Sequence, residues 1–116
     1  YYRECMERLG RDRQYVITSD DIEWCKSIFV GNNFIFNNVI PDGFYKPHFD
    51  FAIATLCDDF ICANSTFSWW AAWLGGKKDK KVFIPTPWFG PALSHIDTEG
   101  YYPSNVEKVE REIVRV

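Results

Sequence analysis

A short polar turn at residues 64–68 carries the side chains best suited to chemistry in this chain. The turn reads Asn-Ser-Thr-Phe-Ser and follows an apolar run at 60–63 that predicts a strand. It leads into an aromatic stretch at 66–74 that predicts a helix. A strand, a small polar turn and a helix together present free backbone N–H groups and the positive end of a helix to an anion. The turn therefore predicts a phosphate or pyrophosphate site at the carboxyl end of a strand.

The same turn also fits ordinary helix capping, because Asn, Ser and Thr are good N-cap residues. One cap accounts for one residue, however, and the run holds four polar residues, Asn64, Ser65, Thr66 and Ser68. We therefore favour ligand binding over capping alone.

Two carboxylate positions are further candidates. Ser19, Asp20 and Asp21 follow a predicted strand, where capping by Ser19 or Asp20 is the simplest interpretation. Ligand contact comes second and metal binding third. Asp50 is predicted to open a helix, so it too could be a cap. A carboxylate there could instead accept two hydrogen bonds from a guanine edge, which would select against bases lacking those donors.

Other catalytic patterns are missing from the sequence. His48 and His95 are isolated, and the chain has neither a glycine-rich phosphate loop nor a G-x-S-x-G nucleophile elbow. The four cysteines have no metal-binding or redox spacing, so we interpret them as buried free thiols in a reducing compartment. Of the tryptophans, Trp69 and Trp73 share a helix face predicted to pack in the core. Trp70 points elsewhere and is predicted to pack at an interface with another domain.

The elements that position these residues alternate between helix and strand. This pattern predicts an α/β fold with a Rossmann-like, mostly parallel sheet, helices on both faces and one domain over residues 1–116. Ligands bind beyond the carboxyl ends of such strands, so the turns at 18–21 and 63–68 are the expected site. Helices are predicted at 1–9, from Ser19 or Asp20 to Gly31, at 50–57, 66–74 and 104–113, and strands at 15–18, 34–36, 60–63 and 82–84.

Composition limits the function classes. Hydrophobic residues make up 47% of the 116 residues, which predicts a folded domain. A net charge of −3 argues against nucleic-acid binding. No apolar stretch reaches the roughly 18 residues that span a bilayer. The chain opens with Tyr1 inside a predicted helix, so we expect a piece of a longer protein.

The residues at 64–74, Asn-Ser-Thr-Phe-Ser-Trp-Trp-Ala-Ala-Trp-Leu, closely resemble the C-terminal signature of alpha-1,2-fucosyltransferases, glycosyltransferase family 11. The block at 15–26, with Ser-Asp-Asp-Ile-Glu-Trp-Cys-Lys at 19–26, resembles a second block of that family. The helix at Asp50 and the stretch at 85–89 also fit. The resemblance runs through most of residues 13–90.

The resemblance implies the C-terminal lobe of a two-lobed, GT-B-type enzyme that binds GDP-fucose and transfers L-fucose to a galactose-containing glycan in alpha-1,2 linkage. Catalysis would be inverting, with no cofactor and no metal. Fixed hydrogen-bond donors would stabilise the charge that develops on the departing pyrophosphate. The implied donor-site residues are Asp50 for guanine, Ser65, Thr66, Phe67 and Ser68 for the phosphates, and Asn64 and Asp20 beside them.

One departure from the family is clear. The His-x-Arg-Arg stretch, whose arginine neutralises the β-phosphate, is missing here and would lie upstream of Tyr1 with the general base. We therefore expect this chain alone to bind GDP weakly and to transfer no fucose. Its partners would be an upstream N-terminal domain and the acceptor glycan, in a bacterial cytoplasm, with membrane association only through segments outside this chain. The alternatives are a non-catalytic α/β module that binds a nucleotide or a partner, and a transferase for another nucleotide sugar.

Overall fold

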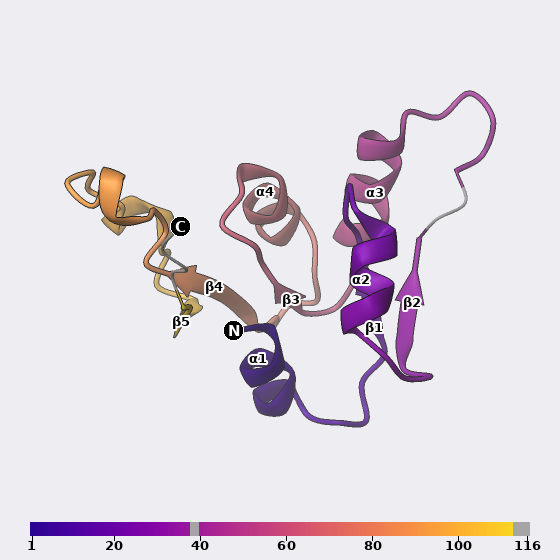
Figure 1. Cartoon of the computed structure of the whole chain (residues 1–116), viewed down its shortest axis with the longest axis horizontal. Coiled ribbons are helices and arrows are strands. Elements are labelled where there is room, and N and C mark those ends of the chain that lie inside the picture. The colour runs from indigo at the N-terminus through magenta and orange to yellow at the C-terminus, as the bar shows by residue number, and fades with distance from the viewer. Residues whose placement is uncertain (38–39, 113–116) are drawn as a thin grey trace.

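Two parallel sheets form the frame of the chain, which the computed structural model describes over residues 1–37 and 40–112 (Figure 1). In each sheet a helix connects a strand to its parallel neighbour, α2 between β1 and β2, and α4 between β3 and β4. The elements are α1 (Tyr2–Leu9), β1 (Tyr15–Ile17), α2 (Ile22–Ile28), β2 (Phe34–Phe36), α3 (Lys46–Thr55), β3 (Phe60–Ile61), α4 (Thr66–Leu74), β4 (Val82–Thr86), β5 (Val106–Glu110) and two 3₁₀ turns, Pro91–Leu93 and Glu99–Tyr101.
The predicted α/β class and parallel strand pairing are confirmed, but the strands do not form one sheet. They form two sheets, β1-β2 and β3-β4-β5, and no strand pairing joins them in the described ranges. Within the larger sheet the prediction of helices on both faces holds. α1 packs on one face through Cys5 against Phe83 and Val109, and α4 packs on the other through Ala72 against Cys62 and Ile84.

The prediction of a helix at 104–113 is wrong. Residues 106–110 form strand β5 beside β4, with Val82 opposite Val106. Val106 and Val109 are three residues apart. That spacing puts two side chains on one face of a helix but on opposite faces of a strand. In the structure Val106 packs against the cluster under α4 and Val109 against the cluster under α1. The predicted helix also includes Ile113, which lies outside the described residues.

The start of α3 also differs from the prediction. The helix begins at Lys46, with Pro47 in its first turn, a position where the missing N–H of proline costs nothing. Asp50 therefore lies in the second turn of the helix and does not open it. Its carboxylate is free of capping and is buried, with 5% of the residue exposed.

The tryptophans and cysteines follow the predictions in part. Trp69 packs against the core and donates its indole N–H to the Tyr101 carbonyl at 2.9 Å. Trp73 stacks on Trp69, with ring centroids 5.5 Å apart, but is half exposed, so its predicted burial is wrong. Trp70 is also half exposed. All four cysteines are free thiols, as predicted, and Cys57 alone among them is only partly buried.

An ion pair ties the two sheets together at their amino ends. Arg13, just before β1, contacts Asp59, just before β3, at 2.5 Å. Lys77 lies 3.2 Å from the same carboxylate, and the Lys81 backbone N–H donates to it at 2.7 Å. Burial acts to raise the pKa of Asp59, but these hydrogen bonds outweigh burial and hold the pKa below its usual value. The sheets are thus joined at one end, and a cavity separates them at the other.

Candidate functional site

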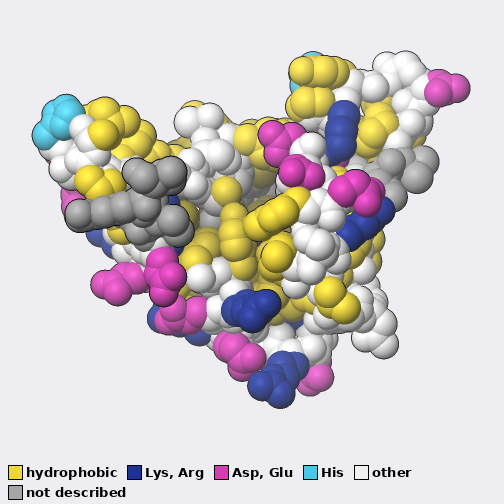
Figure 2. Space-filling view, viewed as in Figure 1, with side chains coloured by type: hydrophobic (Ala, Val, Ile, Leu, Met, Phe, Trp, Pro, Cys, Tyr) yellow, Lys and Arg dark blue, Asp and Glu magenta, His cyan; other side chains and the backbone are white. Residues whose placement is uncertain are grey.

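A cavity of about 570 Å³ lies between the two sheets, at the carboxyl ends of β1 and β3. Residues of α1, α2, α3 and α4 also line it. In an open parallel sheet, this is the end of the strands at which ligands bind. The space-filling view shows hydrophobic side chains gathered in the middle of the face that it draws, between two raised ends of the molecule (Figure 2).

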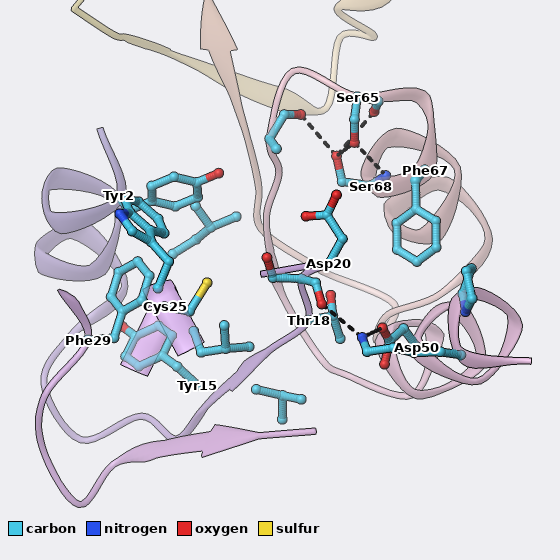
Figure 3. A pocket seen from close by; sticks show the side chains of 18 of the residues that line it. Tyr2, Tyr15, Thr18, Asp20, Cys25, Phe29, Asp50, Ser65, Phe67 and Ser68 are labelled. Atoms are coloured by element: carbon cyan, nitrogen blue, oxygen red, sulfur yellow. Dashed lines mark hydrogen bonds and ion pairs between the residues drawn. The ribbon is translucent and has the colours of Figure 1, made fainter. Parts of the chain in front are cut away.

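The cavity has an apolar half and a polar half (Figure 3). Tyr2, Tyr15, Cys25 and Phe29 gather on one side of it. The other side carries groups that can hydrogen-bond a ligand, Thr18, Asp20, Asp50, Ser65 and Ser68, together with the Phe67 ring. Lys46 and Ser19 also line the cavity and lie beside Asp50, because the Lys46 ammonium bonds both the Asp50 carboxylate and the Ser19 carbonyl.

The polar turn is held by a small hydroxyl network. Ser65 is the N-cap of α4, and its Oγ accepts a hydrogen bond from the Ser68 backbone N–H at 3.2 Å. The Ser68 hydroxyl lies 2.9 Å from the Ala63 carbonyl and 2.9 Å from Ser65 Oγ. A hydroxyl carries one hydrogen. When Ser68 donates to Ala63, the Ser65 hydroxyl hydrogen is available to Ser68 or to a ligand.

Two backbone donors at this turn are free. In the described part of the chain, the N–H groups of Thr66 and Phe67 have no protein acceptor, as expected in the first turn of a helix. At the other end of α4, the Lys80 ammonium donates to the carbonyls of Ala72, Trp73 and Gly75. The helix therefore directs its open, positive end at the polar turn.

The loop after β1 corrects one capping prediction. The N-cap of α2 is Asp21, whose carboxylate accepts from the Trp24 N–H at 3.1 Å. Ser19 Oγ in turn accepts from the Asp21 N–H at 3.0 Å. The predicted cap, Ser19 or Asp20, is therefore displaced by one or two residues. Asp20 takes no part in capping and lines the cavity with an exposed carboxylate.

Asp50 is held from two sides. The Asn37 side-chain amide, at the end of β2, donates to Asp50 Oδ1 at 2.7 Å. The Lys46 ammonium forms an ion pair with Asp50 Oδ2 and donates to the Ser19 carbonyl at 2.8 Å. Lys46 and Asn37 are not among the site residues predicted from the sequence. The signals that could have found them are the four-residue spacing of Lys46 and Asp50 on a helix and the position of Asn37 after a strand.

The cavity gathers most of the predicted site residues and leaves two outside. Asp20, Asp50, Ser65, Phe67 and Ser68 all line it. Asn64 and Thr66 do not, and the Asn64 amide donates to the Trp88 carbonyl at 3.2 Å. The residues that sequence reasoning brought together from two distant turns therefore share one cavity.

Neither histidine belongs to this site. His48 packs edge-on against the Tyr45 ring and is exposed, as is His95. Over residues 1–37 and 40–112 there is no group of three His, Cys, Asp or Glu side chains arranged to hold a metal ion. The helices in those ranges are all too short or too polar to cross a membrane.

Comparison with known proteins gives the same family as the motifs. Residues 1–98 match the family model described as Glycosyl transferase family 11. The chain is 33% identical over 94 residues to the O-antigen biosynthesis glycosyltransferase WbnK of Escherichia coli, a match that covers 77% of this chain and 30% of that protein. It is 37% identical over 78 residues to an alpha-1,2-colitosyltransferase of Escherichia coli, covering 65% of this chain and 26% of the relative. The matches thus span less than a third of either relative. No solved structure gives a significant match.

Proposed function

The chain belongs to glycosyltransferase family 11, and from that membership we propose that it forms the donor-binding lobe of an inverting fucosyltransferase. The proposed donor is GDP-fucose, and the proposed product is an alpha-1,2 linkage to a galactose-containing glycan. The observation that carries the proposal is the cavity between β1 and β3, which brings Asp20 and Asp50 together with Ser65, Phe67 and Ser68 of the polar turn. Its volume of about 570 Å³ is in the range of cofactor and small-molecule sites.

The polar turn would bind the pyrophosphate. The free N–H groups of Thr66 and Phe67 and the positive end of α4 need no rearrangement to meet an anion. The Ser65 hydroxyl can rotate to add a further donor. The leaving group of this reaction is GDP, and its phosphates gain charge as the sugar departs. Donors already aimed at that charge would lower the barrier to sugar transfer.

Asp50 would read the guanine base. Guanine presents two neighbouring donors, its ring N1–H and its exocyclic amine, and a carboxylate can accept both. Each carboxylate oxygen of Asp50 accepts from one protein donor, Asn37 or Lys46, and has a second lone pair left for the base. A base without those donors would cover the remaining lone pairs of this buried carboxylate without hydrogen-bonding them, which is costly.

The remaining parts of the proposal concern the whole enzyme. We assign the general base and the acceptor glycan site to an N-terminal lobe, which fits the much greater length of the relatives. The reaction would need neither a cofactor nor a metal. We also propose a place in a bacterial cytoplasm, and the Escherichia coli relatives support the bacterial part of that proposal. Because one relative is named a colitosyltransferase, a colitosyl donor is the second candidate to be compared with GDP-fucose.

The base assignment is tested with Asp50→Asn and three nucleotides, GDP, UDP and xanthosine diphosphate. Xanthine carries an oxygen where guanine has its exocyclic amine, so an Asn amide suits xanthine as a carboxylate suits guanine. We expect the unsubstituted chain to prefer GDP, and Asp50→Asn to lose about tenfold to a hundredfold in GDP affinity while gaining affinity for xanthosine diphosphate. Ligand-detected NMR with nucleotide at millimolar concentration measures all three.

The matched control is Asp79→Asn, which changes an exposed carboxylate in the loop before β4. It should leave all three affinities unchanged. Equal binding of GDP and UDP by the unsubstituted chain, or an Asp50→Asn variant with unaltered preferences, would contradict the guanine assignment. The absence of any GDP signal would contradict the proposal that this lobe carries the nucleotide site.

A further inference from the structure

The starting observation is a buried carboxylate with two protein donors from different elements. A buried carboxylate is tolerated when it is paired and hydrogen-bonded. Asp50, on α3, receives the Lys46 ammonium on Oδ2 and the Asn37 amide on Oδ1. Because both oxygens are engaged, from one turn earlier in α3 and from the end of β2, rotation of the carboxylate plane is blocked.

Lys46 also connects two walls of the cavity. Its ammonium bonds both Asp50 on α3 and the Ser19 carbonyl in the loop after β1, the loop that carries Asp20. Among the described residues that line the cavity, Lys46 is the single Lys or Arg side chain, and the lining also includes two carboxylates, Asp20 and Asp50. Lys46 thus supplies the local charge compensation and fixes α3 relative to the end of β1.

We infer that Lys46 and Asn37 are positioning residues that give the cavity its selectivity for the nucleobase, by fixing the plane of the Asp50 carboxylate. The inference rests on the proposed function, since it assigns how the base-reading carboxylate is held. Bidentate reading of two donors requires two lone pairs pointing in set directions. A carboxylate free to rotate would still accept a hydrogen bond from one donor, so it would bind nucleotides while distinguishing them poorly.

The measurement is the ratio of GDP to inosine diphosphate affinity. Hypoxanthine keeps the ring N1–H of guanine and lacks the exocyclic amine, so it loses one of the two donors that Asp50 would meet. We expect the unsubstituted chain to favour GDP by about tenfold, the worth of one hydrogen bond to a charged group. In Lys46→Met the ratio should fall toward one. Ligand-detected NMR titration gives both affinities on the same sample.

Lys26→Met is the matched control. Lys26 is also a helix lysine in an ion pair, with Glu23 at 3.3 Å, and its side chain is 35% exposed, against 37% for Lys46. It does not line the cavity. The control should keep the GDP to inosine diphosphate ratio of the unsubstituted chain.

Because Lys46→Met leaves a buried carboxylate without its cation, Asn37→Ala is the second variant. It removes the other donor, keeps the ion pair and should lower the same ratio. Lys46→Arg, which restores a cation with several donors, should recover part of the ratio. An alternative role for Lys46, direct contact with the phosphates, would weaken GDP and inosine diphosphate equally and leave the ratio unchanged, and that result would overturn the inference.

The Asp50→Asn variant separates the two proposals. If Asp50→Asn changes the preference between GDP and xanthosine diphosphate while Lys46→Met and Asn37→Ala keep the original ratio, the positioning role fails and the proposed function stands. If Asp50→Asn changes nothing, the guanine assignment fails and the positioning role fails with it.

Discussion

Ser65 combines the capping of α4 with the anion-binding role that we propose for it. Its Oγ accepts from the Ser68 N–H and so caps α4, and its hydroxyl hydrogen is available at the cavity when Ser68 donates to Ala63. A residue with both roles must fit the cap geometry of α4 and also place a donor at the cavity. Asn would serve as a cap, but its amide is larger than the hydroxyl and would occupy space at the cavity wall.

Replacing Ser65 with Ala tests both roles. We expect Ser65→Ala to lower the free energy of unfolding by about 1 kcal/mol, because an N-cap is lost. GDP affinity should fall while guanosine affinity changes little, because the lost hydroxyl faces the phosphates in our proposal. Urea denaturation and NMR titration measure the two effects.

The control for that substitution is Ser94→Ala, since Ser94 is exposed, follows the turn Pro91–Leu93 and makes no side-chain hydrogen bond in the described structure. Ser94→Ala should alter neither the free energy of unfolding nor the affinity for GDP. Parallel loss of GDP and guanosine affinity in Ser65→Ala would show that the turn does not contact the phosphates.

At the level of elements, the contact between α3 and α4 sets the geometry of the polar half of the cavity. Gly75 ends α4 and lies directly against the backbone of Thr55 at the end of α3. A Cβ on Gly75 would lie 2.4 Å from the Thr55 carbonyl oxygen, well inside van der Waals contact. The two helices can approach this closely because residue 75 has no side chain.

We therefore expect Gly75→Ala to lower the free energy of unfolding by about 1–3 kcal/mol, since neither backbone can yield without moving a helix. Gly90→Ala is its control, because a Cβ there meets nothing within 4 Å and the backbone φ is −74°. Thermal or urea unfolding compares them. Equal stability of the two variants would show that α3 and α4 are not fixed by this contact.

Sequence patterns predict most of these elements because their cause is local. The apolar spacing along α1 and the polar turn before α4 are signals within a few residues. The capping prediction after β1 failed because Ser19, Asp20 and Asp21 can all act as caps. Asp21 is the cap because the helix begins at the next residue, Ile22, and the sequence alone does not fix that start. The start of α3 needed recognition of Pro47 as a first-turn residue. β5 was mistaken for a helix because the pairing partner that makes it a strand is 24 residues away, at Val82.

The candidate site was predictable in its parts and not in its assembly. Parallel topology predicts that the turns at 18–21 and 63–68 meet, and they do meet at one cavity. Nothing local predicts that the strands separate into two sheets with that cavity between them, because sheet continuity depends on the packing of the whole molecule. For the same reason, the contact of Asn37 with Asp50 could not be read from either residue's neighbourhood.

At the level of the whole molecule, the ion pair of Arg13 and Asp59 joins the two sheets opposite the cavity. The Asp59 carboxylate is held with a pKa below its usual value, so it favours the folded state when ionised. The stability it contributes is complete above the unfolded pKa of about 4 and is lost as the pH falls through the lower pKa of the folded state.

Asp59→Asn should accordingly lower the free energy of unfolding by about 1–3 kcal/mol at pH 7, with an attenuated effect because Arg13 is partly exposed. Below about pH 4, the stability of the variant should fall less steeply than that of the unsubstituted chain. Urea denaturation over pH 2–7 measures the slope, with Asp79→Asn as the surface control. Identical slopes below pH 4 would show that the pair does not favour the ionised carboxylate.

The contact of Lys80 with the carbonyl end of α4 has a consequence for the opposite end of that helix. An uncapped helix carries balanced partial charges, and each partly cancels the other at a distance. Here a full positive charge lies on the carbonyls of Ala72, Trp73 and Gly75, while the amino end faces the cavity. The Lys80 charge therefore offsets the partial negative charge at the carbonyl end of α4, and the partial positive charge at the amino end acts on the cavity without that cancellation. The lysine-rich loop at 77–81, which does not line the cavity, thereby contributes to its electrostatic potential.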